Sequence, residues 1–262
     1  MKHPVIALLT DFGNRDFFVG SMKGVIAGIL PAIRIIDITH EVPPFNIKAA
    51  AFILRAAYSY FPTGTIFLAV IDPGVGSPRK VILVKTEDYY YIAPDNGILS
   101  LTLEHDPPVD MCEVSNPEYF LPEVSHTFEA RDRMAPVAAW LASGVPLKKF
   151  GPVLPAYEKL ELPEPVKNEE GIQGEVLYAD KFGNLITNIT EDWLGKCGEK
   201  GREGLILLVG ETSIAYQNSY VEAGKGELLF LPGSLGLLEI AVCEGSAAER
   251  LHLFPGASVF IK

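Results

Sequence analysis

Asp72 and Arg79 are the pair in this sequence best suited to do chemistry together. They stand seven residues apart in DPGVGSPR, directly after Ile66 to Ile71, a short apolar run rich in β-branched and aromatic residues. Such a run predicts an interior strand of a parallel sheet, and open α/β sheets bind ligands at the carboxyl ends of their strands. The alternative interpretation is a structural ion pair that fixes a turn, the commoner role for an isolated Asp and Arg.

The elements before Asp72 predict how this strand end is built. Apolar spacing alternates between strand and helix patterns, and Asp11 follows the first strand as Asp72 follows the third. This β-α-β-α-β order predicts an α/β domain with a mostly parallel, Rossmann-like sheet and right-handed crossovers. The expected strands are Pro4 to Thr10, Ile33 to Ile38 and Ile66 to Ile71, and the expected helices are Phe17 to Ile29 and Ile47 to Tyr60.

The rest of the first domain predicts a hairpin and two helices. Lys80 to Lys85 and Tyr89 to Ala93 form the hairpin, and PDNGILSLTLE predicts a turn and a helix from Asn96 onward. Thr127 to Ser143 predicts a charged loop that leads into a helix bearing Val137 and Leu141.

A change of composition marks a domain boundary. From Gly151 to Gly174 the chain carries several prolines and the charged stretch KNEEG, with little periodicity, which is typical of a linker. We therefore expect an α/β domain over residues 1–160, a linker over 161–172 and a smaller all-β barrel or sandwich over 173–262. The alternating strands of that domain are GEVLYAD, LITNIT, GLILLVG, TSIAYQN, ELLFLPG, LLEIAVC and SVFIK.

Charge and cysteine content narrow the function classes. A formal charge of −11 argues against nucleic acid or an anionic membrane as partner, and so favours a small ligand. The three cysteines, Cys112, Cys197 and Cys243, show no paired or zinc-type spacing, so we expect buried thiols in a reducing cytoplasm and no metal site. The apolar start VIALL is cut by Asp11, which excludes it as a signal peptide or membrane span.

Seven strings in one order carry a resemblance to a known family. They are LTDFG, DITHEVPPF, DPGVGSPR, PDNG, TFEARD, DKFGNLITNI and GSLGLLEIAV, and they extend from Leu9 to Val242. Each is weak evidence alone, but together they resemble the SAM hydroxide adenosyltransferase family, the SAM hydrolases, which are relatives of the fluorinating and chlorinating enzymes.

The resemblance implies a reaction and an assembly. Water or hydroxide would displace methionine from the ribose C5′ of S-adenosyl-L-methionine (SAM), giving adenosine and L-methionine. SAM is then the substrate, and no cofactor is expected. The site would lie between the α/β domain of one subunit and the β domain of its neighbour in a homotrimer.

The resemblance also implies catalytic residues. The Asp and Arg of the family's water-activating triad match Asp72 and Arg79, but Glu129 stands where the family usually has a histidine, and His126 lies three positions early. If Glu129 takes the histidine's place, two carboxylates share one arginine, and repulsion with desolvation should raise one carboxyl pKa. The competing interpretation pairs Glu129 with Arg131 or Arg133 on a loop surface.

The substrate-binding residues implied by the resemblance come from both domains. In the first domain Asp11 would bind the ribose diol, and Phe45 would line the pocket as a ring. In the second domain the implied residues are Asp180 for the methionine ammonium, Phe182 and Asn184 for the adenine, Tyr220 as a second ring, Ser234 and Glu239 near the methionine head group, and Glu244 near the base.

Three functions remain open from the sequence. The first is the SAM hydrolase, the second a SAM-dependent halide adenosyltransferase, and the third a non-catalytic adenosine- or SAM-binding protein that has lost activity with the histidine. The Asp72 and Arg79 pair favours water over halide, because the resemblance implies that the halogenating relatives lack it.

Overall fold

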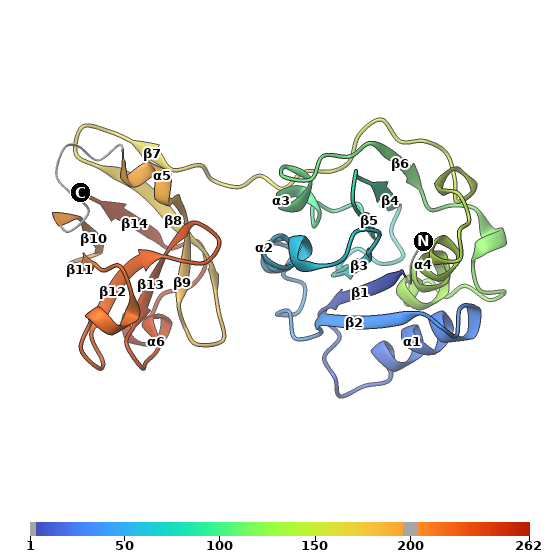
Figure 1. Cartoon of the computed structure of the whole chain (residues 1–262), viewed down its shortest axis with the longest axis horizontal. Coiled ribbons are helices and arrows are strands. Elements are labelled where there is room, and N and C mark those ends of the chain that lie inside the picture. The colour runs from blue at the N-terminus through green and yellow to red at the C-terminus, as the bar shows by residue number, and fades with distance from the viewer. Residues whose placement is uncertain (1–3, 196–203) are drawn as a thin grey trace. The chain divides into compact units, whose positions relative to one another are not determined.

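The computed structural model describes residues 4–195 and 204–262, which divide into two compact units, Met1–Leu160 and Glu161–Lys262 (Figure 1). Cys197 lies outside the described residues. Cys112 is buried as expected, whereas Cys243 is only partly buried. Within the described residues no helix is both long enough and apolar enough to cross a bilayer.

Unit 1 is an α/β domain around a mixed sheet with the strand order β2-β1-β3-β5-β4-β6. Strands β2, β1 and β3 pair in parallel, as expected, and β5 pairs in parallel with β3. Strand β4 runs antiparallel to both β5 and β6. The strands are β1 (Val5–Thr10), β2 (Arg34–Thr39), β3 (Ile66–Val70), β4 (Val81–Lys85), β5 (Tyr90–Pro94) and β6 (Asp110–Glu113).

The prediction of a mostly parallel sheet was therefore only partly correct, and the β4–β5 hairpin explains the difference. The short turn at Thr86 to Tyr89 joins β4 to β5, and a connection this short can join only antiparallel strands. The hairpin itself was predicted correctly, but its second strand, not its first, lies beside β3.

The order of the strands creates a switch point next to β1. From β1 the chain crosses to β2 on one side and then returns past β1 to β3 on the other. Open α/β sheets bind ligands at such a point, outside the carboxyl ends of the strands. Asp11 follows β1 and Asp72 follows β3, so both carboxylates belong to this edge of the sheet.

The helices of unit 1 follow the predicted order, with two corrections. Their bounds are α1 (Phe18–Ile29), α2 (Ile47–Ala57), α3 (Ser100–Leu103) and α4 (Ala135–Ala142), with short 3₁₀ turns at Tyr58–Tyr60, Pro117–Tyr119 and Leu147–Lys149. Helix α3 begins at Ser100 instead of Asn96, because Gly97 has a φ of +91°, which a helix does not accommodate.

The second correction concerns the charged stretch before α4, which is not a loop. Residues Ala130–Met134 form a π-helical turn that runs directly into α4. Pro136 has no N–H, so the carbonyl of Asp132 lacks the usual helical donor four residues on. That carbonyl accepts the N–H of Leu121 at 2.9 Å instead.

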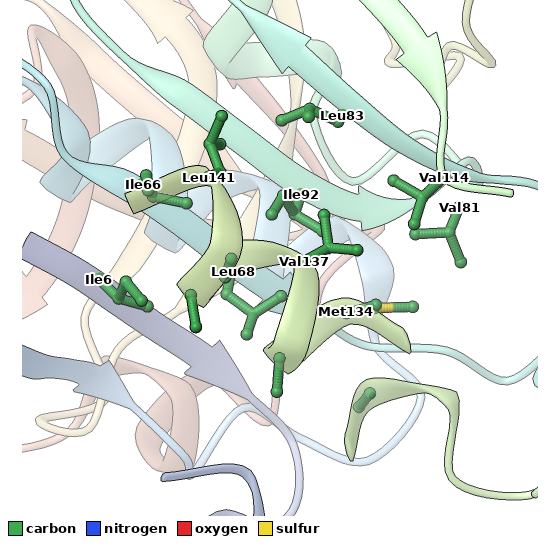
Figure 2. Packing of buried hydrophobic residues seen from close by; sticks show 14 of the residues in the cluster. Ile6, Ile66, Leu68, Val81, Leu83, Ile92, Val114, Met134, Val137 and Leu141 are labelled. Carbon is green, nitrogen blue, oxygen red and sulfur yellow. The ribbon is translucent and has the colours of Figure 1, made fainter. Parts of the chain in front are cut away.

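The core of unit 1 lies between the sheet and α4. Leu68 on β3 is fully buried and belongs to one apolar cluster with Val137 and Leu141 of α4. Figure 2 shows these helix side chains beside the strand residues Ile66, Leu68 and Ile92. Alternation along β3 turns Phe67 to the opposite face, where its ring stacks on Tyr91 with 5.1 Å between centroids.

Unit 2 is a closed barrel of antiparallel character. The strand order β14-β10-β11-β12-β13-β9-β8 is closed by pairing of β14 with β8, and β11 with β12 is its one parallel pair among the described strands. The bounds are β8 (Ile172–Ala179), β9 (Leu185–Thr190), β10 (Ile206–Val209), β11 (Thr212–Tyr216), β12 (Leu228–Pro232), β13 (Leu237–Val242) and β14 (Ser258–Ile261).

The smaller elements of unit 2 complete its outline. Helices α5 (Glu191–Leu194) and α6 (Ala247–Leu251) follow β9 and β13. The predicted linker contains the two-residue strand β7 (Val166–Lys167), which pairs with β8. Alternate residues such as Leu238 and Ile240 fill the barrel interior.

We expect Leu68→Ala to destabilise unit 1 by about 2–5 kcal/mol, because the truncation removes buried surface and leaves a cavity under α4. Urea denaturation followed by far-UV circular dichroism measures the change. Val109→Ala is the control: Val109 is 64% exposed, so its truncation should change the free energy of unfolding by less than about 0.5 kcal/mol. Equal effects of the two substitutions would contradict this account of the core.

Candidate active site

Asp72 and Arg79 form a buried, bidentate ion pair. Arg79 donates from Nε to Asp72 Oδ1 at 2.7 Å and from Nη2 to Asp72 Oδ2. The two side chains are only 6% and 11% exposed, so this is not the solvated surface pair of the alternative interpretation. Two parallel hydrogen bonds fix the guanidinium in the plane of the carboxylate.

The position of this pair follows from β3 and from the turn after β5. Asp72 comes two residues after the end of β3, and the side chain of Asn96 donates to the carbonyl of Ile71 at 2.9 Å. The PDNG segment therefore braces the strand end that carries Asp72. The sequence alone carries no signal for this role of Asn96.

Glu129 joins the pair from a different part of the chain. Arg79 Nη2 donates to Glu129 Oε2 at 2.5 Å, and Arg133 Nη1 lies 3.2 Å from Glu129 Oε1. Glu129 is 4% exposed, so it is not on a loop surface, although one of the two arginines considered as its surface partners does contact it. The other, Arg131, pairs with Asp132, and His126 is exposed.

Two close contacts bring the TFEARD segment to the strand ends. Gly76, with φ of +80°, lies so close to the carbonyl of His126 that a Cβ there would be 2.7 Å from the oxygen. Phe128 packs edge-on against Phe12 at 5.9 Å and against Phe18 at 5.2 Å between centroids. These contacts set Glu129 beside Arg79 and connect it to the turn that carries Asp11.

The electrostatics of the site centre on Asp72. Burial raises the pKa of Asp72 above its usual value of 3.8, and the negative charge of Glu129 adds to this rise. The hydrogen bonds and charge of Arg79 lower the pKa but do not cancel the effect of burial. The carboxyl with the raised pKa is thus Asp72, and a base of raised pKa accepts a proton more readily near neutral pH.

Asp11 and Phe45 also come together. Asp11 Oδ2 accepts the backbone N–H of Phe45 at 2.8 Å, which holds Phe45 at a φ of +64° with its ring 71% exposed. Gly13, two residues after Asp11 in the same turn, donates its N–H to the carbonyl of His40 at 2.7 Å. Asp11 Oδ1 has no hydrogen bond among the described residues, so its lone pairs are not used by the protein there.

In unit 2 the predicted residues gather around the turn between β8 and β9. Asp180 Oδ1 accepts the N–H groups of Phe182 and Asn184, and its Oδ2 accepts from the Asn184 side chain at 3.0 Å. Phe182 is 66% exposed. Asp180 therefore shapes the turn, and its contact with a methionine ammonium stays a prediction.

Gly183 fixes that turn against the start of α6. Its φ is +82°, and a Cβ would lie 2.0 Å from the Oγ of Ser246. Glu244, two residues before Ser246, has a φ of +55°, and its side chain pairs with Lys225 at 2.6 Å. The backbone of Glu244 is thus placed near the turn that carries Phe182.

Tyr220 and Glu239 form a second group in unit 2. The Tyr220 hydroxyl donates to Glu239 Oε1. Burial raises the pKa of Glu239, and the charge of nearby Asp180 adds to the rise. Ser234 is exposed in the tight turn between β12 and β13, next to Gly233, whose backbone lies against the Glu239 carboxylate.

No group of His, Cys, Asp or Glu residues in the described ranges could hold a metal ion.

Comparison with known proteins identifies the family. The N-terminal domain model of SAM hydroxide adenosyltransferase matches residues 6–151, and the C-terminal domain model matches residues 174–260. The chain belongs to the SAM hydroxide adenosyltransferase family. The resemblance inferred from the seven sequence strings is confirmed.

Individual relatives agree with this assignment. A protein from Thermus thermophilus named (R)-S-adenosyl-L-methionine hydrolase is 36% identical over 97% of this chain and 98% of its own length. A fluorinase from an Actinoplanes species is 27% identical over 99% of this chain and 97% of its own. The crystal structure of a conserved protein from Thermotoga maritima matches with a TM-score of 0.91 and 41% identity over 98% of this chain and 99% of that one.

We expect Glu129→Gln to lower the pKa of Asp72, because it removes a negative charge beside that carboxyl and leaves Arg79 to Asp72 alone. The acid limb of any activity that needs ionised Asp72 then moves to lower pH. NMR titration of ¹³C-labelled carboxyl groups measures the pKa directly. Glu87→Gln, in the turn at the opposite end of β3, should leave the Asp72 titration unchanged; an identical Asp72 titration in the parent and Glu129→Gln would contradict the interpretation.

Proposed function

We propose that this protein hydrolyses SAM, using water or hydroxide to attack the ribose C5′ and releasing adenosine and L-methionine. The observation that carries the proposal is the buried Asp72 and Arg79 pair at the carboxyl end of β3, in a chain of this family. Named SAM hydrolases among its relatives support it over almost the full length of the chain.

The chemistry that we propose is a single displacement. The water oxygen forms a bond to C5′ while the bond between C5′ and sulfur breaks, and its electron pair moves to sulfur to give the neutral thioether of methionine. The proton released by the water goes to Asp72. Because the sulfonium charge disappears along this path, a dry site favours the transition state over the bound cation.

Positioning supplies much of the rate enhancement. A water held in line behind C5′ reacts as if in an intramolecular step, which lowers the barrier by roughly 7 kcal/mol or more. The bidentate contact with Arg79 fixes the Asp72 carboxylate that would hold this water. Arg79 keeps the carboxylate ionised, while burial and Glu129 make it a stronger base than an exposed Asp.

Water is a better nucleophile for this site than halide. Asp72 and Glu129 place two buried carboxylates around one side of Arg79. A halide ion placed beside them would be repelled, whereas a water molecule can donate a hydrogen bond to Asp72. This favours the hydrolase over the halide adenosyltransferase.

We assign substrate contacts to both units. Asp11 would bind the ribose hydroxyls with Phe45 beside the sugar, and Phe182, Asn184 and Tyr220 would bind adenine, with Glu244 contributing its backbone. Asp180, Ser234 and Glu239 would bind the methionine portion. As the resemblance implies, we propose a cytoplasmic homotrimer that uses no cofactor, with SAM bound at subunit interfaces. Phe45 and Phe182 are 71% and 66% exposed, so both residues are accessible to a ligand.

Asp72→Asn should abolish adenosine formation while the affinity for SAM stays within a few fold, because the amide cannot take the proton of the water. Product analysis by liquid chromatography beside calorimetry of SAM binding measures both. Asp88→Asn, at the opposite end of β3, is the matched control and should form adenosine at the parent rate. If Asp72→Asn also reacts at the parent rate, the ion pair is structural and the proposed mechanism is wrong.

Asp11→Ala should weaken adenosine binding by roughly 1.5–3 kcal/mol, the value of hydrogen bonds to a charged acceptor. The parent should prefer adenosine to 2′-deoxyadenosine, since the diol donates to Asp11, and the variant should bind the two equally. Calorimetry with both nucleosides makes the comparison. Unchanged discrimination in Asp11→Ala would remove Asp11 from ribose binding.

A further inference from the structure

Glu129 lies between two arginines, and only one of them belongs to the catalytic pair. Arg79 Nη2 donates to its Oε2 at 2.5 Å, and Arg133 Nη1 lies 3.2 Å from its Oε1. The sequence Asp72, Arg79, Glu129, Arg133 is therefore a continuous row of alternating charges that starts at the end of β3 and ends on the π-helical turn.

Charge balance makes the fourth member of this row necessary. Asp72 already takes Nε and Nη2 of Arg79 in a bidentate contact. Without Arg133, two carboxylates, each only 6% exposed, would share a single cation. Leaving a buried carboxylate without its own cation is strongly unfavourable, so the site would lose stability or take up a proton.

The other charged groups around Glu129 have different partners. On the same turn Arg131 pairs with Asp132 at 2.6 Å. Helix α1, which packs against this turn, has one charged side chain, Lys23, and that pairs with Asp37. Helix α4 carries none, and His126, in the preceding loop, is exposed. Arg133 is thus the second cation that contacts Glu129 within the described residues.

Arg133 is also held in a way that directs it to Glu129. Its guanidinium lies over the ring of Phe120, 5.4 Å from the centroid, and its Nε is buried with no hydrogen-bond partner among the described residues. The ring accommodates the face of the guanidinium without competing for its N–H groups. Arg133 stands four residues after Glu129, and the π-helical turn brings both side chains to the same side of the helix.

We propose that Arg133 is a positioning residue of the active site, which supplies the second positive charge that lets a carboxylate stand at position 129 beside Asp72 and Arg79. It acts through Glu129: by fixing Glu129, it fixes the guanidinium of Arg79 against Asp72. Its catalytic consequence rests on the proposed SAM hydrolysis, whereas the charge pairing itself does not.

A double-mutant cycle on thermal stability tests the pairing without reference to activity. Arg133→Met keeps an unbranched apolar stem but removes the guanidinium and its charge, and at pH 7 it should lower the Tm by about 5 °C or more. In the Glu129→Gln background, Arg133→Met should cost little, because the amide does not need the cation.

Arg131→Met is the matched control, since it removes an arginine from the same turn that does not contact Glu129. Its effect on Tm should be the same in the parent and in Glu129→Gln. Arg133→Lys, which keeps the charge, should recover part of the Tm lost in Arg133→Met. Equal loss of Tm from Arg133→Met in both backgrounds would overturn the proposal.

Single-turnover adenosine formation from SAM tests the catalytic part. Arg133→Met should slow it by roughly tenfold or more at pH 7, because a small displacement of Arg79 and Asp72 disturbs the attacking water. Arg133→Lys should restore part of the rate. An unchanged rate and pH profile in Arg133→Met would overturn the positioning role. If the parent forms no adenosine, the proposed hydrolysis fails, while the Tm cycle still decides the pairing.

Discussion

The site depends on the pairing of buried opposite charges. Removing carboxylates and guanidinium groups from water is costly, and their mutual attraction offsets that cost only when geometry and hydrogen bonding are good. Asp72 and Arg79 meet this condition through two parallel hydrogen bonds, and Glu129 takes a further N–H of the same guanidinium. This arrangement gives an ionised carboxylate in a poorly hydrated place, which is what activation of a water molecule needs.

Apolar packing in unit 1 holds these charged groups in place. Asp72 and Arg79 come from the loop between β3 and β4, and Glu129 comes from the segment before the π-helical turn. Both segments are anchored by apolar packing a few residues away. Asp72 follows β3, whose Leu68 is fully buried, while Glu129 follows Phe128, which packs on the rings of Phe12 and Phe18. The rigidity of the core is thereby transferred to the polar groups at the edge of the sheet.

Local sequence was enough to predict most elements. Every strand expected in unit 2 is present, because alternation of apolar residues and glycine-rich turns are local signals. The direction of β4 and the start of α3 were harder to predict from the sequence. The first depends on turn geometry, and the second depends on the backbone conformation of Gly97. The π-helical turn was missed because the sequence does not show that the carbonyl of Asp132, which lacks a helical donor at Pro136, accepts the N–H of the distant Leu121 instead.

In the candidate site, too, some contacts could be predicted from the sequence and others could not. Asp72 and Arg79 were paired from spacing within one loop, and the structure brings them together. The partner of Glu129 was open in the sequence, because choosing between Arg79, Arg131 and Arg133 requires knowing which side of the helical turn faces β3. Opposite charges four residues apart on a helix were the available signal for Arg133. For Asp180 there was no such signal in the sequence. Its hydrogen bonds within the turn are visible only in the structure.

The most direct test of the account is the origin of the 5′-oxygen in the product. SAM is incubated with the purified protein in H₂¹⁸O, with and without chloride, and the products are analysed by mass spectrometry. Attack by water at C5′ predicts adenosine that carries one ¹⁸O, unlabelled methionine, and no chlorinated nucleoside in either condition. Formation of 5′-chloro-5′-deoxyadenosine with chloride present, adenosine without the label, or the absence of any product would contradict it.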